Sequence, residues 1–230
     1  SKFAISTEET RYYLNGVYLH IADAEGGKAL RCVATDGHRL ARIDAEMPEG
    51  AAEMPGVIVP RKTVGELRKL VDETTADIVV ELSDTKIRFS FDDTVVTSKL
   101  IDGTFPDYQR VIPEGNDKKM EINAKVFANA VDRVSAISSE KSRAVKLNLT
   151  NDNLTLSASS SDDGNATEEV EASYQGEELE IGFNAAYLLD ITRQIEGSNA
   201  RLLLADAASP TILSEVDDAS TLYVLMPMRV

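Results

Sequence analysis

The chain has few of the residues from which catalytic and metal sites are usually built. Its 230 residues include one cysteine and two histidines. The single cysteine, Cys32, excludes an internal disulfide and is typical of a reducing compartment. Two histidines and one cysteine cannot supply a recognisable zinc site. No glycine-rich phosphate loop and no calcium-loop spacing occur either. We therefore predict that the protein is not an enzyme and uses no cofactor.

Long apolar runs and an excess of positive charge are also missing. No run approaches the roughly 18 residues that a membrane-spanning helix needs. Hydrophobic residues still make up 43% of the chain, which is enough for ordinary packed cores. The 39 acidic and 24 basic side chains give a net charge of −15. This balance argues against a conventional nucleic-acid binder, but it allows one whose positive charge is confined to a single surface.

One segment of the chain occurs twice. Residues 4–11 (AISTEETR) return as residues 136–143 (AISSEKSR), with five identical positions and two exchanges of Thr for Ser. Three further segments align with later ones, namely 30–34 with 154–158, 57–60 with 180–183, and 77–82 with 200–204. Self-similarity over a domain-sized distance predicts two copies of one unit. We expect the units at residues 1–113 and 114–230, with 111–119 as the linker.

The second copy of the repeat follows an amphipathic helical stretch at residues 123–135. In the first copy, the corresponding helix would lie almost entirely before Ser1. We therefore expect that the chain is a fragment and that more protein lies upstream.

Most of the chain is expected to form short strands with alternating polarity. The turns between them are predicted at 25–27, 92–93 and 151–153. One helix is predicted to start after Pro60 and to end near Thr74, and two others start at the N-caps Asn123 and Asn184. Each unit is thus α+β, a run of strands punctuated by two helices.

Two local patterns complete this prediction. The polar, acidic stretch 157–169 is expected to be a mobile loop. The alternation of Leu30, Cys32 and Ala34 is expected to bury Cys32 as a small hydrophobic side chain.

The helix predicted after Pro60 carries a stripe of positive charge. A helical projection places four basic side chains within about 120° of one another, namely Arg61, Lys62, Arg68 and Lys69. The opposite side is apolar and consists of Val64, Leu67 and Val71. Such a stripe either contacts the phosphates of a nucleic acid or is simply a solvated helix face.

Two further features each allow two interpretations. The sequence Asp36-Gly37-His38 places a carboxylate near an imidazole, which a hydrolase could use as a general base. No nucleophile motif accompanies it, so a tight turn with a surface histidine is favoured. Met226 and Met228 stand near the end of the chain. They form either a surface for apolar ligands or the tail of a last strand.

Several motifs spread along the chain resemble one family. They are RYYLNG at 11–16, ATDGHRL at 34–40, VPRK at 59–62, TSKL at 97–100, FPDY at 105–108, GFN at 182–184 and MPMR at 226–229. Together they are similar to the bacterial sliding clamp, the beta subunit of DNA polymerase III. The resemblance covers the whole chain, in order, and corresponds to the middle and C-terminal clamp domains.

The resemblance implies a cytoplasmic processivity factor of DNA replication. Two chains of three similar domains each would join head to tail into a homodimeric ring around duplex DNA, with helices lining the hole and antiparallel sheets outside. Locally basic helices inside an acidic ring would explain the charge of the chain. The DNA-facing residues would be Arg11, Tyr12, Tyr13, Arg61, Lys62, Arg68, Lys69, Arg133, Arg143 and Lys146. Glu8 and Glu9 depart from this pattern, because they place negative charge in the loop before the two tyrosines.

The resemblance also implies a pocket for short peptides of DNA polymerase, the clamp loader and repair proteins. The residues carried over by motif are Leu14, Thr35, Gly37, His38, Arg39, Leu40, Pro106, Arg110, Val111, Asn184, Tyr187, Leu225, Met226, Pro227, Met228 and Arg229. Apolar and thioether walls would take a Leu and a Phe of the partner. The alternative is a tandem-domain scaffold that uses the same pocket but has no DNA role in this form.

Overall fold

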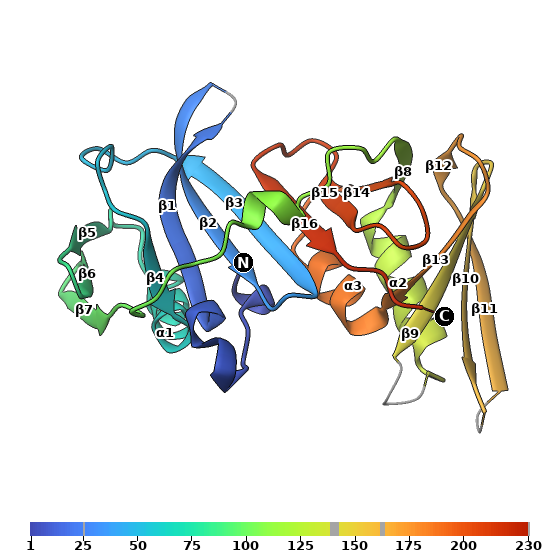
Figure 1. The fold of residues 1–230 in the computed structure, drawn as a ribbon, viewed down its shortest axis with the longest axis horizontal. Helices are drawn as coiled ribbons and strands as arrows, with labels where there is room; N and C mark the ends of the chain where they lie inside the picture. The colour runs from blue at the N-terminus through green and yellow to red at the C-terminus, as the bar shows by residue number, and fades with distance from the viewer. Residues whose placement is uncertain (25, 139–142, 162–163, 230) are drawn as a thin grey trace. The chain divides into compact units, whose positions relative to one another are not determined.

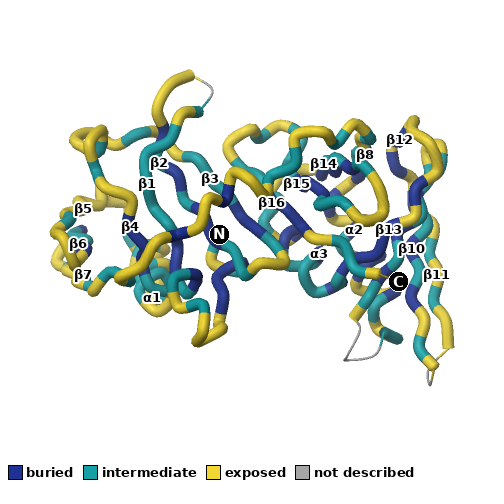
Figure 2. Tube along the Cα trace, in the orientation of Figure 1, coloured by how far each residue is buried: buried dark blue, intermediate teal, exposed yellow. Residues whose placement is uncertain are grey.

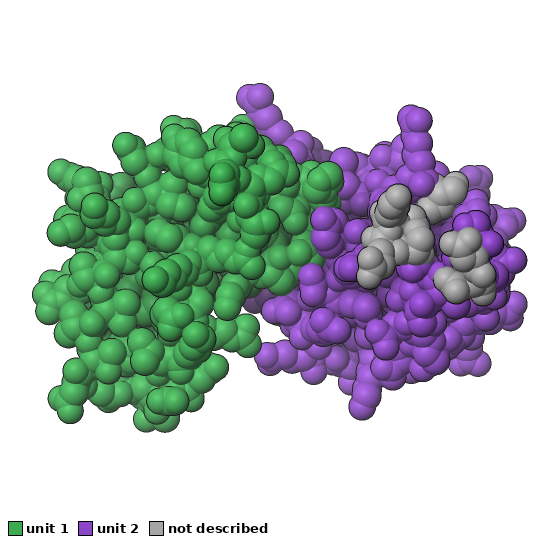
Figure 3. Space-filling view, turned by 90° about the horizontal axis from the view of Figure 1, so that it is seen from below, with its two compact units in different colours: residues 1–107 green, residues 108–230 purple. Residues whose placement is uncertain are grey.

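The computed structural model describes residues 1–24, 26–138, 143–161 and 164–229. It separates into two compact units, Ser1–Asp107 and Tyr108–Val230, which Figure 3 shows in different colours. The division falls earlier than the expected one after residue 113. Asn116 explains why the intervening segment groups with the second unit, because its Nδ2 donates hydrogen bonds to the carbonyl oxygens of Leu203 and Pro210.

The first unit contains two antiparallel sheets and one α-helix (Figure 1). The four-stranded sheet has the order β4-β1-β2-β3 and consists of β1 Gly16–Ala24, β2 Gly27–Thr35, β3 Arg39–Glu46 and β4 Val57–Pro60. The three-stranded sheet consists of β5 Val79–Leu82, β6 Lys86–Phe91 and β7 Thr94–Lys99. Helix α1 spans Arg61–Val71, and two 3-10 helices, η1 Lys2–Ala4 and η2 Glu9–Leu14, precede β1.

The second unit also contains two antiparallel sheets. One has the order β11-β10-β9-β13 and consists of β9 Ala144–Thr150, β10 Asn153–Ser160, β11 Gly164–Glu171 and β13 Leu179–Asn184. The other has the order β12-β8-β14-β15-β16 and consists of β8 Lys118–Asn123, β12 Ser173–Tyr174, β14 Asn199–Leu204, β15 Thr211–Glu215 and β16 Thr221–Leu225. The helical elements are η3 Tyr108–Val111, α2 Ala124–Ser135 and α3 Ala185–Thr192.

The strand orders confirm that one unit is present twice. The order β4-β1-β2-β3 in the first unit corresponds to β13-β9-β10-β11 in the second, and β5-β6-β7 corresponds to β14-β15-β16. Helix α1 follows β4 just as α3 follows β13. The three further aligned segments therefore fall in equivalent strands, β2 and β10, β4 and β13, and β5 and β14. Residues 139–142 of the repeat lie outside the described residues.

The helices of the two units are buried to different depths (Figure 2). In the second unit, α2 buries Phe127 and Val131 and α3 buries Leu188. In the first unit, no side chain of α1 is fully buried, and Val64 is only partly buried against the core. The second unit has the two predicted helices, whereas the described residues of the first have one α-helix.

The predicted helix starts are confirmed, and one predicted helix end is wrong. The Asn123 side chain caps α2 by accepting a 3.0 Å hydrogen bond from the amide of Val126. Helix α1 ends at Val71 rather than near Thr74. The chain leaves the helix in turns there, since the amide of Thr74 donates to the carbonyl of Val71.

The expectation of a mobile loop at 157–169 is wrong for the described part of that segment. Most of it belongs to β10 and β11, which pair from Asn153 opposite Glu171 to Ser160 opposite Gly164. Its polar side chains are compatible with a strand because β11 is the edge of its sheet and faces solvent. Residues 162 and 163 lie outside the described residues.

The expected burial of one face of β2 is only partly confirmed. Ala34 on that face is buried, but Leu30 and Cys32 are half-buried, and Ala29, Arg31 and Val33 on the opposite face are buried as well. Arg31 can occupy this face because its guanidinium forms a two-point ion pair with Asp44, at 2.6 and 2.7 Å. Burial raises the pKa of the Cys32 thiol.

No helix among the described residues is both long and apolar enough to cross a lipid bilayer.

The pairing of β1 with β4 predicts a sensitive glycine. A Cβ added to Gly16 would lie 2.3 Å from the carbonyl oxygen of Val59, whereas one added to Gly115 would meet no atom within 4 Å. We expect Gly16→Ala to lower the free energy of unfolding by about 1–3 kcal/mol. Gly115→Ala is the control and should change it by less than about 1 kcal/mol. Calorimetric or urea unfolding measures both, and equal stabilities would contradict the close approach.

Candidate functional site

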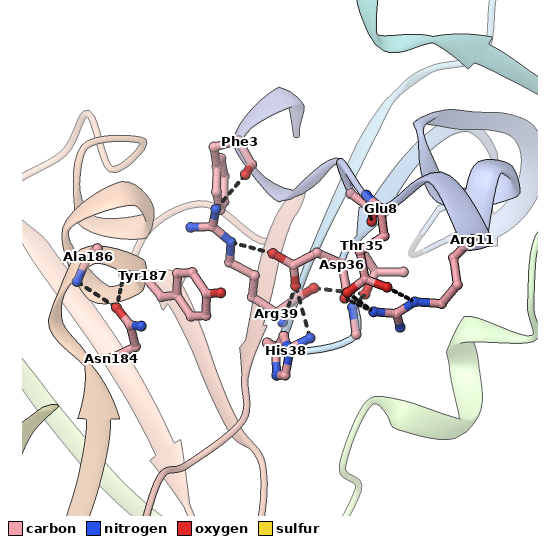
Figure 4. A network of polar contacts seen from close by, with 12 residues as sticks. Phe3, Glu8, Arg11, Thr35, Asp36, His38, Arg39, Asn184, Ala186 and Tyr187 are labelled. Atoms are coloured by element: carbon pink, nitrogen blue, oxygen red, sulfur yellow. Dashed lines mark hydrogen bonds and ion pairs between the residues drawn. The ribbon is translucent and has the colours of Figure 1, made fainter. Parts of the chain in front are cut away.

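Residues 35–39 form a tight turn between β2 and β3 (Figure 4). The Oδ1 atom of Asp36 accepts hydrogen bonds from the amides of His38 and Arg39, at 2.9 and 3.0 Å. The Thr35 hydroxyl accepts from the amide of Gly37 and donates to the carbonyl of Arg39. Gly37 has a φ of +89°, a conformation that favours glycine. The turn is therefore fixed from within and presents His38 at the surface.

The Arg39 side chain ties this turn to η1. Its Nε donates to Asp36 Oδ2 at 3.1 Å, and its Nη2 donates to the carbonyl of Phe3 at 2.7 Å. The guanidinium also lies over the Phe3 ring, 5.3 Å from its centroid. Both carboxylate oxygens of Asp36 thus accept bonds from the backbone or from Arg39. This supports a structural turn rather than a general-base pair of Asp36 and His38.

The Arg11 side chain reaches the turn from η2 (Figure 4). Its Nε and Nη2 bond to the two carboxylate oxygens of Glu8, at 2.9 and 2.7 Å. The same Nη2 donates to the carbonyl of Asp36 at 3.2 Å. The hydrogen bond between Arg11 and Glu8 lowers the pKa of the Glu8 carboxyl and raises that of the Arg11 guanidinium. Glu8, one of the two acidic residues that depart from the family pattern, is therefore engaged by a neighbouring cation.

In the second unit, the candidate residues gather at the start of α3. The Asn184 side chain caps this helix by accepting from the amides of Ala186 and Tyr187, at 2.9 and 3.3 Å (Figure 4). The amide of Met228 donates to the carbonyl of Gly182 at 2.8 Å, so the C-terminal segment lies beside the end of β13. The geometry thus brings Met228 near Asn184, 44 positions earlier in the sequence.

The candidate peptide-binding residues divide between the two units. The first unit holds Leu14, Thr35, Gly37, His38, Arg39, Leu40 and Pro106. The second holds Arg110, Val111, Asn184, Tyr187, Leu225, Met226, Pro227, Met228 and Arg229. Leu14, Leu40 and Leu225 are buried, so they support the surface rather than form it. Val111 and Met226 are 50% and 40% exposed, which leaves large apolar side chains at the surface of the second unit.

The basic side chains of α1 are exposed as the sequence predicts. Arg61, Lys62, Arg68 and Lys69 are all exposed, whereas Val64 and Leu67 on the opposite side are half-buried. A surface hollow of about 510 Å³ lies along this helix and is lined by Lys2, Arg61, Lys62, Gly65, Glu66 and Lys69. The single carboxylate in this lining, Glu66, forms a 3.0 Å ion pair with Lys69.

The hollow includes one basic residue that the sequence analysis did not find. A Cβ added to Gly65 would lie 3.3 Å from the Nζ of Lys2. Lys2 therefore passes over the middle of the basic stripe, where the absence of a side chain at position 65 leaves room. No local pattern could reveal this contact, because the two residues are far apart in the chain.

The other candidate DNA-facing residues have different surroundings. Arg133 bonds to both carboxylate oxygens of Glu168, and Lys146 forms a 2.9 Å ion pair with Glu180. Arg143 is exposed and has a φ of +41°. Tyr12 is 53% exposed. Tyr13 packs edge-on against the Tyr12 ring. Of the whole set, the α1 cations form the largest exposed group.

The duplicated α+β fold is that of the sliding-clamp class. Family models agree in both units. The model for the DNA polymerase III beta subunit, central domain, matches residues 1–107, and the model for its C-terminal domain matches residues 109–229. The chain belongs to the DNA polymerase III beta subunit family, the bacterial beta sliding clamps.

Known relatives are similar over the whole of this chain. The beta sliding clamp of Caulobacter vibrioides strain NA1000 is 52% identical over 230 residues, which cover 62% of that protein. A sliding clamp from Bartonella birtlesii, solved bound to griselimycin, is 55% identical with a TM-score of 0.96. The DNA polymerase III subunit beta of Pseudomonas aeruginosa is 40% identical with a TM-score of 0.93. Both structures match all of this chain, which covers 62% of each of them.

The cap of α3 gives a prediction for the second unit. Asn184→Ala removes the acceptor for two helix amides, so we expect the free energy of unfolding to fall by about 1 kcal/mol. Asn184→Asp keeps an acceptor at the helix N-terminus and adds a favourable negative charge, so it should retain the stability. Differential scanning calorimetry measures both variants. Equal losses in the two would show that the cap is not the stabilising feature.

Proposed function

We propose that this protein is a processivity factor of DNA replication. It would form part of a head-to-tail ring that encircles duplex DNA without sequence preference and tethers partner proteins to it. The observation that carries this proposal is the match of both units, in order, to the two family models. In this role the chain tethers other proteins and catalyses no reaction of its own.

The contact with DNA rests mainly on α1. Cations at roughly the spacing of phosphates provide affinity without reading bases, and a sliding protein needs such contacts. The four exposed cations of α1 and the neighbouring Lys2 supply them in a chain whose net charge is −15. Acidic residues elsewhere would discourage DNA from binding to other surfaces. Arg11, Arg133 and Lys146 contribute less in this proposal, because carboxylates already pair with them, and the same applies to Lys69 of α1, which pairs with Glu66.

The contact with partner proteins rests on the two groups of pocket residues. The His38 turn of the first unit and the Met228 segment of the second would each contribute contacts to a peptide of the Gln-Leu-x-Leu-Phe type. Methionine side chains adapt to several related apolar ligands, which suits a surface shared by many partners. Burying about 200 Å² of apolar ligand surface contributes about 5 kcal/mol before entropic losses, so micromolar affinity is expected.

The DNA contact predicts a loss of retention on DNA. In the full-length protein, we expect replacement of Arg61, Lys62, Arg68 and Lys69 by Gln to reduce loading and retention on circular duplex DNA by about tenfold or more. The reason is the loss of up to four phosphate contacts. Each lost contact should also reduce the slope of log K against log salt concentration by up to about 0.9. Gel filtration of DNA-bound, labelled protein over a salt series measures both quantities.

The control removes four cations from strands of the same unit. They are Lys28, Lys86, Arg88 and Lys99, all exposed. This variant has the same net charge as the α1 variant and should keep its retention. Equal losses in the two variants would mean that overall charge, rather than the α1 face, governs binding. Unchanged retention in the α1 variant would refute the DNA role of this helix.

The peptide contact predicts a specific role for Met228. We expect Met228→Ala to weaken binding of a fluorescent Gln-Leu-x-Leu-Phe-type peptide to this chain by about tenfold, since an apolar wall of the pocket is lost. Fluorescence anisotropy titration measures the affinity. Val95→Ala, which truncates an exposed apolar side chain on β7, is the control. Unchanged affinity in Met228→Ala would refute the assigned pocket.

A further inference from the structure

The Arg11 side chain already donates its hydrogen bonds to acceptors within the protein, unlike an arginine that is free to bind DNA. Its guanidinium forms a two-point ion pair with Glu8 and donates a third bond to the carbonyl of Asp36. An arginine that holds three acceptor atoms has its planar donor group fixed in orientation. The DNA phosphates would have to displace Glu8 before they could use the same donors. These contacts indicate a different principal role for Arg11.

The turn that Arg11 contacts is the one that presents His38. Arg11 bonds to the carbonyl of Asp36, while the Asp36 carboxylate holds the amides of His38 and Arg39. The bond from Arg11 therefore acts on the residue that organises the rest of the turn. Arg11 belongs to η2, whereas Arg39 connects the same turn to Phe3 of η1. Two arginines thus hold the turn from two separate segments.

Close packing supports this assignment. A Cβ added to Gly37 would lie 2.7 Å from Arg11 Nη1, so the guanidinium lies directly against the backbone of the turn. A side chain at position 37 would push the guanidinium away from this position. The positive φ of Gly37 independently favours glycine there.

We propose that Arg11 is a positioning residue for peptide binding, that Glu8 holds it in place, and that the Glu8–Arg11 pair fixes the turn at residues 35–39 in its binding conformation. The proposal rests on the peptide-binding function proposed above. Arg11 acts through the turn, whose residues contact the peptide. Glu8 then has a definite purpose in a loop where negative charge would otherwise only oppose DNA.

Glu9 provides a matched control for Glu8. It is the next residue and the first of η2, it carries the same charge, and it is exposed. None of the ion pairs found among the described residues involves Glu9. Glu8→Gln and Glu9→Gln therefore change the charge of the loop equally, but only the first breaks an ion pair with Arg11.

The experiment titrates the labelled Gln-Leu-x-Leu-Phe-type peptide with this chain and its variants. Loss of a charge-assisted bond should weaken peptide binding about three- to tenfold in Glu8→Gln, with less than a twofold change in Glu9→Gln. Arg11→Ala should weaken binding at least as much. The double variant should bind no more weakly than Arg11→Ala, because coupled residues are not additive. Melting temperatures verify that all variants are folded.

Amide hydrogen exchange of the free protein provides a second readout. Residues 36–39 should exchange faster in Glu8→Gln and Arg11→Ala than in Glu9→Gln. If Arg11 instead bound the peptide directly, Arg11→Ala would weaken binding while Glu8→Gln and the exchange rates stayed unchanged, and the proposal would be overturned. Failure of the unmodified chain to bind the peptide would refute the peptide-binding function itself, an outcome that is separate from any effect of the variants.

Discussion

The pairing of β1 with β4 determines where the functional elements of the first unit lie. Gly16 stands opposite Pro60, and the absence of a side chain lets the two backbones approach closely. The amide of Arg61 then donates a 3.0 Å hydrogen bond to the carbonyl of Asn15. Helix η2, which contains Tyr12 and Tyr13, ends just before β1, and α1 begins just after β4. This contact therefore brings η2 and α1 to the same end of one sheet. The position of the basic surface of α1 depends on that arrangement.

Ion pairing decides which charged side chains are available to ligands. The chain carries 24 basic residues, but several that the family resemblance suggested for DNA are held by carboxylates at 2.5–2.9 Å. Such exposed pairs contribute little stability, so their main effect is on the local field and on side-chain orientation. In the hollow along α1, four cations (Lys2, Arg61, Lys62 and Lys69) outnumber the single carboxylate. The surface along α1 is therefore positive because its cations outnumber the carboxylates beside them.

The sequence predicted those features that depend on neighbouring residues. Periodicity and capping residues located the start of α2 at Asn123 and of α3 at Asn184, and the repeat predicted the shared strand order. The predicted end of α1 and the predicted loop at 157–169 were wrong. The loop prediction failed because polar residues suit a loop and an edge strand equally well. The contacts of Lys2 with Gly65 and of Arg11 with Asp36 could not be predicted. Each joins residues that only the folded sheet brings together.

Helix α1 differs from α2 and α3 in having no fully buried side chain. A helix that contributes so little to the core should open locally at a low free energy, well before its unit unfolds. The surface proposed to face DNA would then be compliant rather than rigid. As a duplex slides past, the α1 backbone could shift slightly when its cations exchange one phosphate for the next. This would favour sliding over tight binding in one register.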